Sequence, residues 1–299
     1  MFKAFTPKDI GVRHPGALVA VVAAGMCFAA GDMAAKTLSA TVPATQIAWM
    51  RYLVFAVISV PAAYALHGRD GLATARPWFQ AGRAAAITGS TLLFILGLGR
   101  LGLAEATAIN FTSPIMVMAI APLALGEKAA GSRWMSAAIA FAGVLVIAKP
   151  GGGAFSPAAL FPAAAALCWA ISSILTRAMA SERTETTMAW SSVAGCAALA
   201  VTLPFAWHSL NLAEALLALA VGIFSTGGNW LVIVALRLAP ASYLAPFFYL
   251  QIISAGAMAW MLTGVPPSPS TFLGGTLIAL AGILAARRKP DGQSRQRPG

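Results

Sequence analysis

Three ionisable side chains, Asp32, Lys36 and Arg51, stand inside or beside long apolar stretches of this sequence. Asp32 and Lys36 are four residues apart, so they share one face of a helix. Asp32 lies about 16 residues, or roughly 24 Å, into its apolar run. A carboxylate at that depth indicates a gate, a proton-linked group or an anchor for an ammonium group. The alternative is an ion pair between Asp32 and Lys36 near the end of the helix.

A second apolar run contains Asn110 and Pro114, one helical turn apart. A proline inside a helix leaves the carbonyl one turn earlier without its usual donor. Such freed groups are tolerated in a membrane where they face protein or a watery cavity. Asn110 is therefore a candidate contact for a substrate, and the alternative is a hydrogen bond to a neighbouring helix.

Aromatic residues and one amide share a face in a later run, where Tyr243, Phe247 and Gln251 are spaced four apart. Trp169 lies deeper in its own run than the aromatic belts found at membrane interfaces. An aromatic wall with few polar groups suits an amphipathic organic molecule, whereas the alternative for Trp169 is core packing. The remaining candidates for lining a cavity are Ser90, Phe94, Asn229 and Trp230.

The elements that carry these residues are transmembrane helices. The chain is 59% apolar and 10% charged, with a mean hydropathy of +0.79, whereas about a quarter of the residues in soluble proteins are charged. A hydrocarbon core of about 30 Å needs about 20 apolar residues in a helix. Ten runs meet this requirement, at 16–38, 45–66, 82–99, 103–125, 132–149, 157–179, 186–207, 213–237, 241–262 and 270–287.

The distribution of basic residues predicts the orientation in the membrane. With ten spans, 16 of the 20 Lys and Arg residues fall on the side of the two termini. Since cytoplasmic loops carry the excess of Lys and Arg, both termini are expected in the cytoplasm. The net charge of +11 therefore reports topology, and no nucleic-acid partner is expected. The three cysteines lie in apolar runs, so no disulfide framework is expected.

Internal similarity divides the chain into two units. Residues 26–36 align with 167–177, which pairs Phe28 with Trp169 at an offset of about 141. Arg100 and Arg237 begin similar segments about 137 residues apart. The predicted units are residues 16–149 and 157–288, between cytoplasmic tails at 1–15 and 289–299. Five spans in each unit invert the second unit relative to the first, an arrangement that transporters use for alternating access.

With its five-plus-five repeat and Gly126-Glu127-Lys128 closing the fourth span, the chain resembles the EamA-type transporters of the drug/metabolite transporter superfamily. Gly264 stands where the second repeat would carry the acidic residue of that motif. Among the family the chain most resembles the YddG-type amino-acid exporters. The resemblance implies an all-α integral membrane fold of ten helices around a central cavity, lined mainly by spans one, three, four, six, eight and nine.

The expected function is a secondary transporter in the inner (plasma) membrane that exports amino acids, aromatic or other apolar ones included, or related small metabolites. The alternative is an importer or exchanger of another metabolite, vitamin or drug. A more distant alternative, an integral-membrane lipid enzyme, would need polar residues clustered at the headgroup level. Asp32, Lys36 and Arg51 are the candidates for gating or coupling.

We expect no catalytic residues, metal or cofactor, because no Cys/His/Asp spacing matches a metal site and no glycine-rich phosphate loop is present. The expected partners are the small-molecule substrate and the lipid bilayer, with the chain acting as a monomer or a homodimer.

Overall fold

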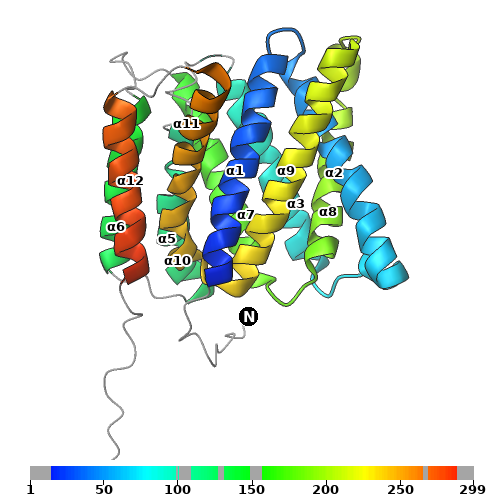
Figure 1. Cartoon of the computed structure of the whole chain (residues 1–299). Helices are drawn as coiled ribbons and strands as arrows, with labels where there is room; N and C mark the ends of the chain where they lie inside the picture. The colour runs from blue at the N-terminus through cyan, green and yellow to red at the C-terminus, as the bar shows by residue number, and fades with distance from the viewer. Residues whose placement is uncertain are drawn as a thin grey trace, which may run out of the picture.

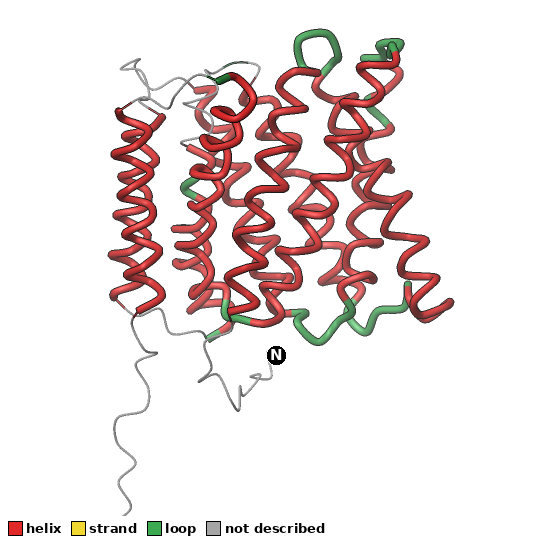
Figure 2. Tube along the Cα trace, in the orientation of Figure 1, coloured by secondary structure: helices red, strands yellow, loops and turns green. Residues whose placement is uncertain are grey.

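The computed structural model describes residues 15–98, 100, 109–126, 131–148, 157–264 and 269–287. This part of the chain is an all-helical bundle, with helices running roughly parallel between two ends (Figures 1 and 2). Helix α1 begins and helix α12 ends at the same end of the bundle. The predicted tails, which lie beyond these two helices, fall almost wholly outside the described residues.

Long apolar helices dominate the described part. Judged by length and composition alone, six stretches of this part are long and apolar enough to cross a membrane. They correspond to α1 (Pro15–Leu38), α2 (Ala44–His67), α3 (Pro77–Leu98), α7 (Leu160–Ala178), α8 (Thr184–Ala200) and α9 (Leu212–Leu238). The shorter apolar helices are α5 (Ser113–Leu125), α6 (Gly131–Ala148), α11 (Leu250–Thr263) and α12 (Pro269–Arg287). The predicted all-α membrane fold is confirmed.

Two of the predicted spans are interrupted. Before α5, residues 109–110 are helical and residues 111–112 form a turn. The predicted span 241–262 has three parts, α10 (Ala241–Leu244), the 3₁₀ segment η4 (Ala245–Tyr249) and α11. Pro114 lies in the first turn of α5, where its missing N–H costs no helical hydrogen bond, and Pro246 lies in the first turn of η4.

Both α5 and α11 end at a glycine in the left-handed conformation. Gly126 and Gly264 each have φ of 67°, and their backbone N–H groups donate to the carbonyls of Pro122 and Trp260. Only glycine adopts this conformation without steric cost, which makes it the common helix terminator. The two broken helices therefore end in the same way.

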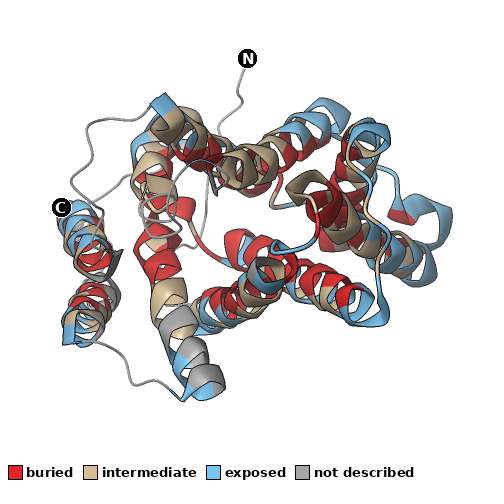
Figure 3. Ribbon diagram, turned by 90° about the horizontal axis from the view of Figure 1, so that it is seen from above, coloured by how far each residue is buried: buried red, intermediate tan, exposed pale blue. Residues whose placement is uncertain are grey.

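Helix pairs fill the bundle from one edge to the other. Helix α1 packs along α9, and α3 packs along α7, with α2 against α8 and α6 against α12 at opposite edges (Figure 1). Further contacts join α1 to α11, α5 to α7, α2 to α9 and α3 to α8. Seen from above, buried residues lie on the faces that the helices turn toward one another (Figure 3).

The largest buried cluster joins α1, α5, α6, α7, α9, α10, η4 and α12, with Met118, Leu244 and Tyr249 among its fully buried side chains. Small residues permit the close approach of helices here, as is usual in membranes. An added Cβ on Gly25 would lie 3.1 Å from the Cα of Gln251, so α1 and α11 are nearly in backbone contact.

Candidate functional site

An aromatic contact between α1 and α7 forms the centre of the candidate site. The rings of Phe28 and Trp169 meet edge to face, with centroids 5.9 Å apart and planes at 80°, a geometry favoured by their quadrupoles. Gly228 of α9 makes room for Phe28, because a Cβ there would lie 2.7 Å from the ring. Phe28 is buried and Trp169 is half-buried, so part of the indole remains accessible.

Asp32 lies one turn beyond Phe28 on the same face of α1 and is exposed. Its electrostatic partner is Arg51 of α2, which is half-buried. These two predicted coupling residues, on different helices, are therefore near enough to interact electrostatically. The side chain of Lys36 lies outside the described residues, so the predicted Asp32–Lys36 pair stays a prediction.

The two interrupted helices meet at their breaks. Phe111, in the turn before α5, stacks on Tyr249 at the end of η4, with centroids 6.0 Å apart and planes at 25°. Asn110 precedes this stack, and its buried Oδ1 has no hydrogen-bond partner in the described part of the chain. Pro114 is buried in the first turn of α5. The fourth and ninth predicted spans are therefore in contact next to Pro114.

The predicted aromatic face follows the second break. The rings of Tyr243 and Phe247 lie 5.7 Å apart, with Phe247 buried and Tyr243 half-buried. Gln251 is half-buried in the first turn of α11, next to Gly25 of α1. These three candidates lie along one short stretch, as their spacing predicts.

The remaining candidates divide between the interior and the outer surface. Ser90 donates to the carbonyl of Ala165 at 2.9 Å, and Asn229 donates to its own helix at Ser225 O, also at 2.9 Å. Phe94 is half-buried on α3. Trp230 is 45% exposed, on the same side of α9 as the exposed Ile223. The structure therefore places Trp230 apart from the other candidates.

A buried cation, Arg83, was missed by the sequence reasoning, which counted it among the charges on the side of the termini, at the edge of the predicted span 82–99. Helix α3 begins earlier, at Pro77, so Arg83 lies well inside the helix, with 2% exposure. Its Nε donates to Thr176 Oγ1 of α7 at 2.7 Å, and its Nη1 donates to Ser191 Oγ of α8. A sequence signal was available, because the polar residues Gln80, Arg83 and Ser90 recur at helical spacing. All three are buried in the structure.

The segment between α2 and α3 is fastened to the junction of α7 and α8. Glu182 accepts from Thr74 Oγ1 at 3.0 Å and from the backbone N–H of Ala75 at 3.3 Å. Thr186 Oγ1 donates to the carbonyl of Gly71 at 2.7 Å, and Arg76 donates to that of Ala178 at 2.8 Å. These contacts close this end of the bundle between the two predicted units.

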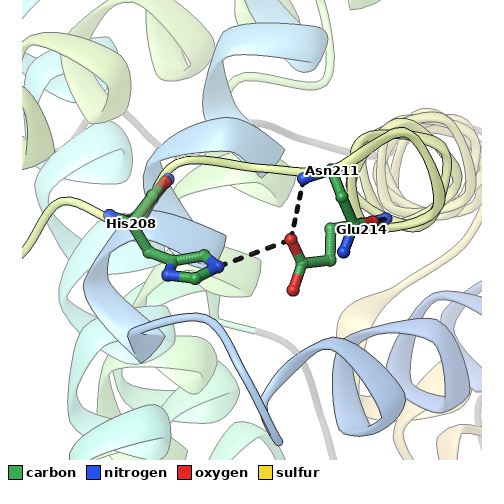
Figure 4. A network of polar contacts seen from close by, with 4 residues as sticks. His208, Asn211 and Glu214 are labelled. Carbon is green, nitrogen blue, oxygen red and sulfur yellow. Dashed lines mark hydrogen bonds and ion pairs between the residues drawn. The ribbon is translucent and has the colours of Figure 1, made fainter.

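A smaller set of hydrogen bonds joins the start of α2 to the segment after α8, at the opposite end of the bundle. Gln46 of α2 exchanges two hydrogen bonds with the backbone of His208, at 2.7 and 2.8 Å. The His208 ring lies 3.4 Å from Glu214, whose carboxylate also accepts from the backbone N–H of Asn211 at 2.9 Å (Figure 4). Asn211 and Glu214 form a capping box that starts α9. Both ends of the α2–α8 pair are thus tied.

Groups suited to catalysis are sparse in the described residues, where no cluster of three or more His, Cys, Asp or Glu side chains could hold a metal. A cleft of about 340 Å³ lies at the ends of α7 and α9, lined by Ala180, Val234, Arg237 and Leu238. Arg237 is engaged there with the Ala180 carbonyl and Thr184 Oγ1, at 3.1 and 2.7 Å. The one charged residue that lines this cleft, Arg237, is therefore already hydrogen-bonded to other parts of the protein.

The fold and the candidate site define a helical membrane bundle that carries polar and aromatic groups on its inner helix faces. The chain belongs to the EamA-like transporter family, which matches it in two stretches, residues 15–149 and 156–287.

Named relatives carry different metabolites. The riboflavin transporter of Rhizobium johnstonii is 27% identical over 90% of each chain. The S-adenosylmethionine uptake transporter of Rickettsia felis is 23% identical over 89% of this chain and 91% of that one. The pseudopaline exporter of Pseudomonas aeruginosa is 26% identical over 92% and 96%.

A crystal structure of a protein that is 18% identical shares the fold, with a TM-score of 0.79 over 90% of this chain and 96% of that chain. The predicted EamA family is confirmed, and the chain is a multi-pass membrane transporter of small metabolites. The narrower likeness to amino-acid exporters finds no support in the names of these relatives.

Proposed function

We propose that the chain is a secondary transporter built from two inverted five-helix repeats, ten spans in all, with the predicted boundaries 16–149 and 157–288. The helix contacts support this proposal. Exchanging each helix for its counterpart in the other repeat converts the α1–α9 contact into α7–α3, and α5–α7 into α11–α1. The α2–α8 and α6–α12 contacts map onto themselves. An exchange of this kind is expected of a pseudo-two-fold axis.

Residue contacts support the same axis. Phe28 and Trp169 occupy equivalent positions in the two repeats, and their rings touch. Residues that touch their own counterparts lie close to a two-fold axis. Phe111 and Tyr249 differ by about one residue from equivalence and are stacked. We place the substrate-binding site where this axis, which lies in the membrane plane for inverted repeats, passes between the two repeats, with both termini in the cytoplasm as the loop charges predict.

The carried substrate is, we propose, a small metabolite with a planar heteroaromatic ring. The observation that carries this proposal is the half-buried Trp169 indole, which contacts Phe28 one helical turn from the exposed Asp32, because an aromatic platform and a carboxylate suit a flat molecule with a polar or cationic group. Riboflavin and S-adenosylmethionine, named for two relatives, share such a ring. Asp32 would face the cationic or hydrogen-bonding group of the substrate.

Uptake into liposomes containing the purified protein tests this proposal. The panel comprises radiolabelled riboflavin, S-adenosylmethionine, phenylalanine and leucine, each with and without a pH gradient. We expect saturable uptake of at least one of the two heteroaromatic compounds, with less than a tenth of that rate for the amino acids. Uptake of the amino acids alone would replace this proposal with the amino-acid exporter predicted from the sequence. If a pH gradient changes the rate and Asp32→Asn abolishes this effect, Asp32 is assigned to proton coupling.

A further inference from the structure

The breaks in the two interrupted helices are equivalent features of the two repeats. Thr112, in the first break, and Tyr249, at the end of the second, are 137 residues apart, the spacing of Arg100 and Arg237. In the first break, the Ile109 carbonyl accepts from both the backbone N–H and Oγ1 of Thr112, at 3.0 and 2.7 Å. In the second, the 3₁₀ segment replaces the α-helical pattern over Ala245–Tyr249.

Two of the five buried side-chain polar atoms that lack a partner in the described residues lie at these breaks. The Tyr249 side chain is fully buried, and its hydroxyl has no hydrogen-bond partner in the described part of the chain. The buried Oδ1 of Asn110 also lacks a partner there, and Asn110 adjoins Phe111, which stacks on the Tyr249 ring. Gln251 follows two residues after Tyr249. Nearly all buried polar groups in proteins are hydrogen-bonded, so two orphaned atoms at one contact are unusual.

The surroundings of Tyr249 explain why this arrangement is costly without a ligand. Tyr249 belongs to a buried cluster of apolar side chains, Leu244, Phe247 and Met118 among them. Removing a hydroxyl from water without a replacement partner is unfavourable in such surroundings. In transporters, substrates and ions bind where transmembrane helices are interrupted.

We propose that the paired breaks form a subsite for the uncharged polar part of the substrate, with the Tyr249 hydroxyl as its main contact and Asn110 beside it. This inference rests on the proposed function and deepens it. Tyr, Asn and Gln side chains both donate and accept hydrogen bonds and are neutral. The subsite therefore recognises a neutral group that also does both, either a sugar-like hydroxyl chain or the amide-like edge of a heteroaromatic ring.

The charged and the neutral polar side chains of the site lie in different parts of it. Asp32 and Arg51 supply the charges near one end, whereas the contact at the breaks involves only the neutral side chains of Asn110, Phe111 and Tyr249. A charged group at the breaks would lose its hydration without gaining a counter-charge. We therefore expect a phosphorylated form of the substrate to be rejected.

Tyr249→Phe tests the subsite, and Tyr52→Phe is its matched control. Tyr52 is also a buried tyrosine, but its hydroxyl lies 3.4 Å from Thr91 Oγ1. The first measurement is the melting temperature of each purified protein without substrate. We expect Tyr249→Phe to melt at or above the wild-type temperature, because it removes an unpaired hydroxyl, and Tyr52→Phe to melt below it. A lower melting temperature for Tyr249→Phe would show a protein partner for its hydroxyl and overturn the inference.

The second measurement is binding of riboflavin, riboflavin 5′-phosphate and lumichrome, which has the ring without the hydroxyl chain. Loss of one neutral hydrogen bond should weaken riboflavin binding about 3- to 10-fold in Tyr249→Phe, and Tyr52→Phe should bind as the wild type does. An equal loss for lumichrome assigns the contact to the ring edge, and no loss assigns it to the chain.

Unchanged riboflavin binding in Tyr249→Phe, or tight binding of the phosphate, would overturn the inference. If the wild type bound none of riboflavin, lumichrome and S-adenosylmethionine, the proposed substrate class would fail, and the melting temperatures alone would decide the inference.

Discussion

Two neighbouring glycines in α9 give opposite expectations for the same substitution. A Cβ added to Gly228 would lie 2.7 Å from the Phe28 ring, whereas one added to Gly227 would meet only Cys27 Sγ at 3.7 Å. Gly→Ala within a helix gains about 1 kcal/mol in helix propensity, and overpacking a core costs about 1–3 kcal/mol. Gly227→Ala should therefore stabilise the protein by up to about 1 kcal/mol, and Gly228→Ala should destabilise it by up to about 2 kcal/mol.

Transport should separate the two variants more clearly than stability does. Phe28 is held between α9 and Trp169, so Gly228→Ala displaces the ring that supports the aromatic platform. We expect the melting temperature of Gly228→Ala to fall below that of Gly227→Ala by roughly 2 °C or more, at about 2–4 °C per kcal/mol. Initial rates in liposomes should fall at least about tenfold for Gly228→Ala only. Equal rates in both variants would refute the role of the Phe28–Trp169 contact.

Two further variants test the interior. Trp169→Ala should lower transport of the heteroaromatic substrate at least about tenfold, because it removes the half-buried aromatic platform. Trp230→Ala, on the outer face of α9, should leave the rate within about twofold, and similar losses in both variants would contradict the assignment. Arg83→Lys keeps the charge, but a lysine cannot reproduce the separate Nε and Nη1 contacts to Thr176 and Ser191. Thermal unfolding should show a loss of about 1–3 kcal/mol, and an unchanged melting temperature would mean that these two bonds contribute little.

Apolar run length was enough to predict the helices, because membrane spans must satisfy their backbone internally. Local spacing also placed Tyr243, Phe247 and Gln251 on one face. Run length does not report helix ends that depend on tertiary contacts, however, and Arg83 shows this limit. Its burial follows from hydroxyls on α7 and α8, about 93 and 108 residues away in the chain.

Contacts between the two predicted units were similarly beyond local reasoning. The alignment of Phe28 with Trp169 was visible in the sequence, but their contact depends on how α1 and α7 pack. The 3₁₀ segment at Pro246 and the stack of Tyr249 on Phe111 likewise depend on the packing of η4 against α5. Trp230 shows the converse, since an aromatic residue beside Asn229 lies on the outer face of α9.

Alternating access to the midplane is the central claim, and cysteine labelling tests it most directly. Gln251→Cys, in a background without the three native cysteines, is treated with a membrane-impermeant maleimide from either side of sealed vesicles. We expect labelling from both sides, slowed by substrate, and no labelling of Trp230→Cys in the same background. Labelling of Gln251→Cys from one side only, unaffected by a transported substrate, would contradict the account.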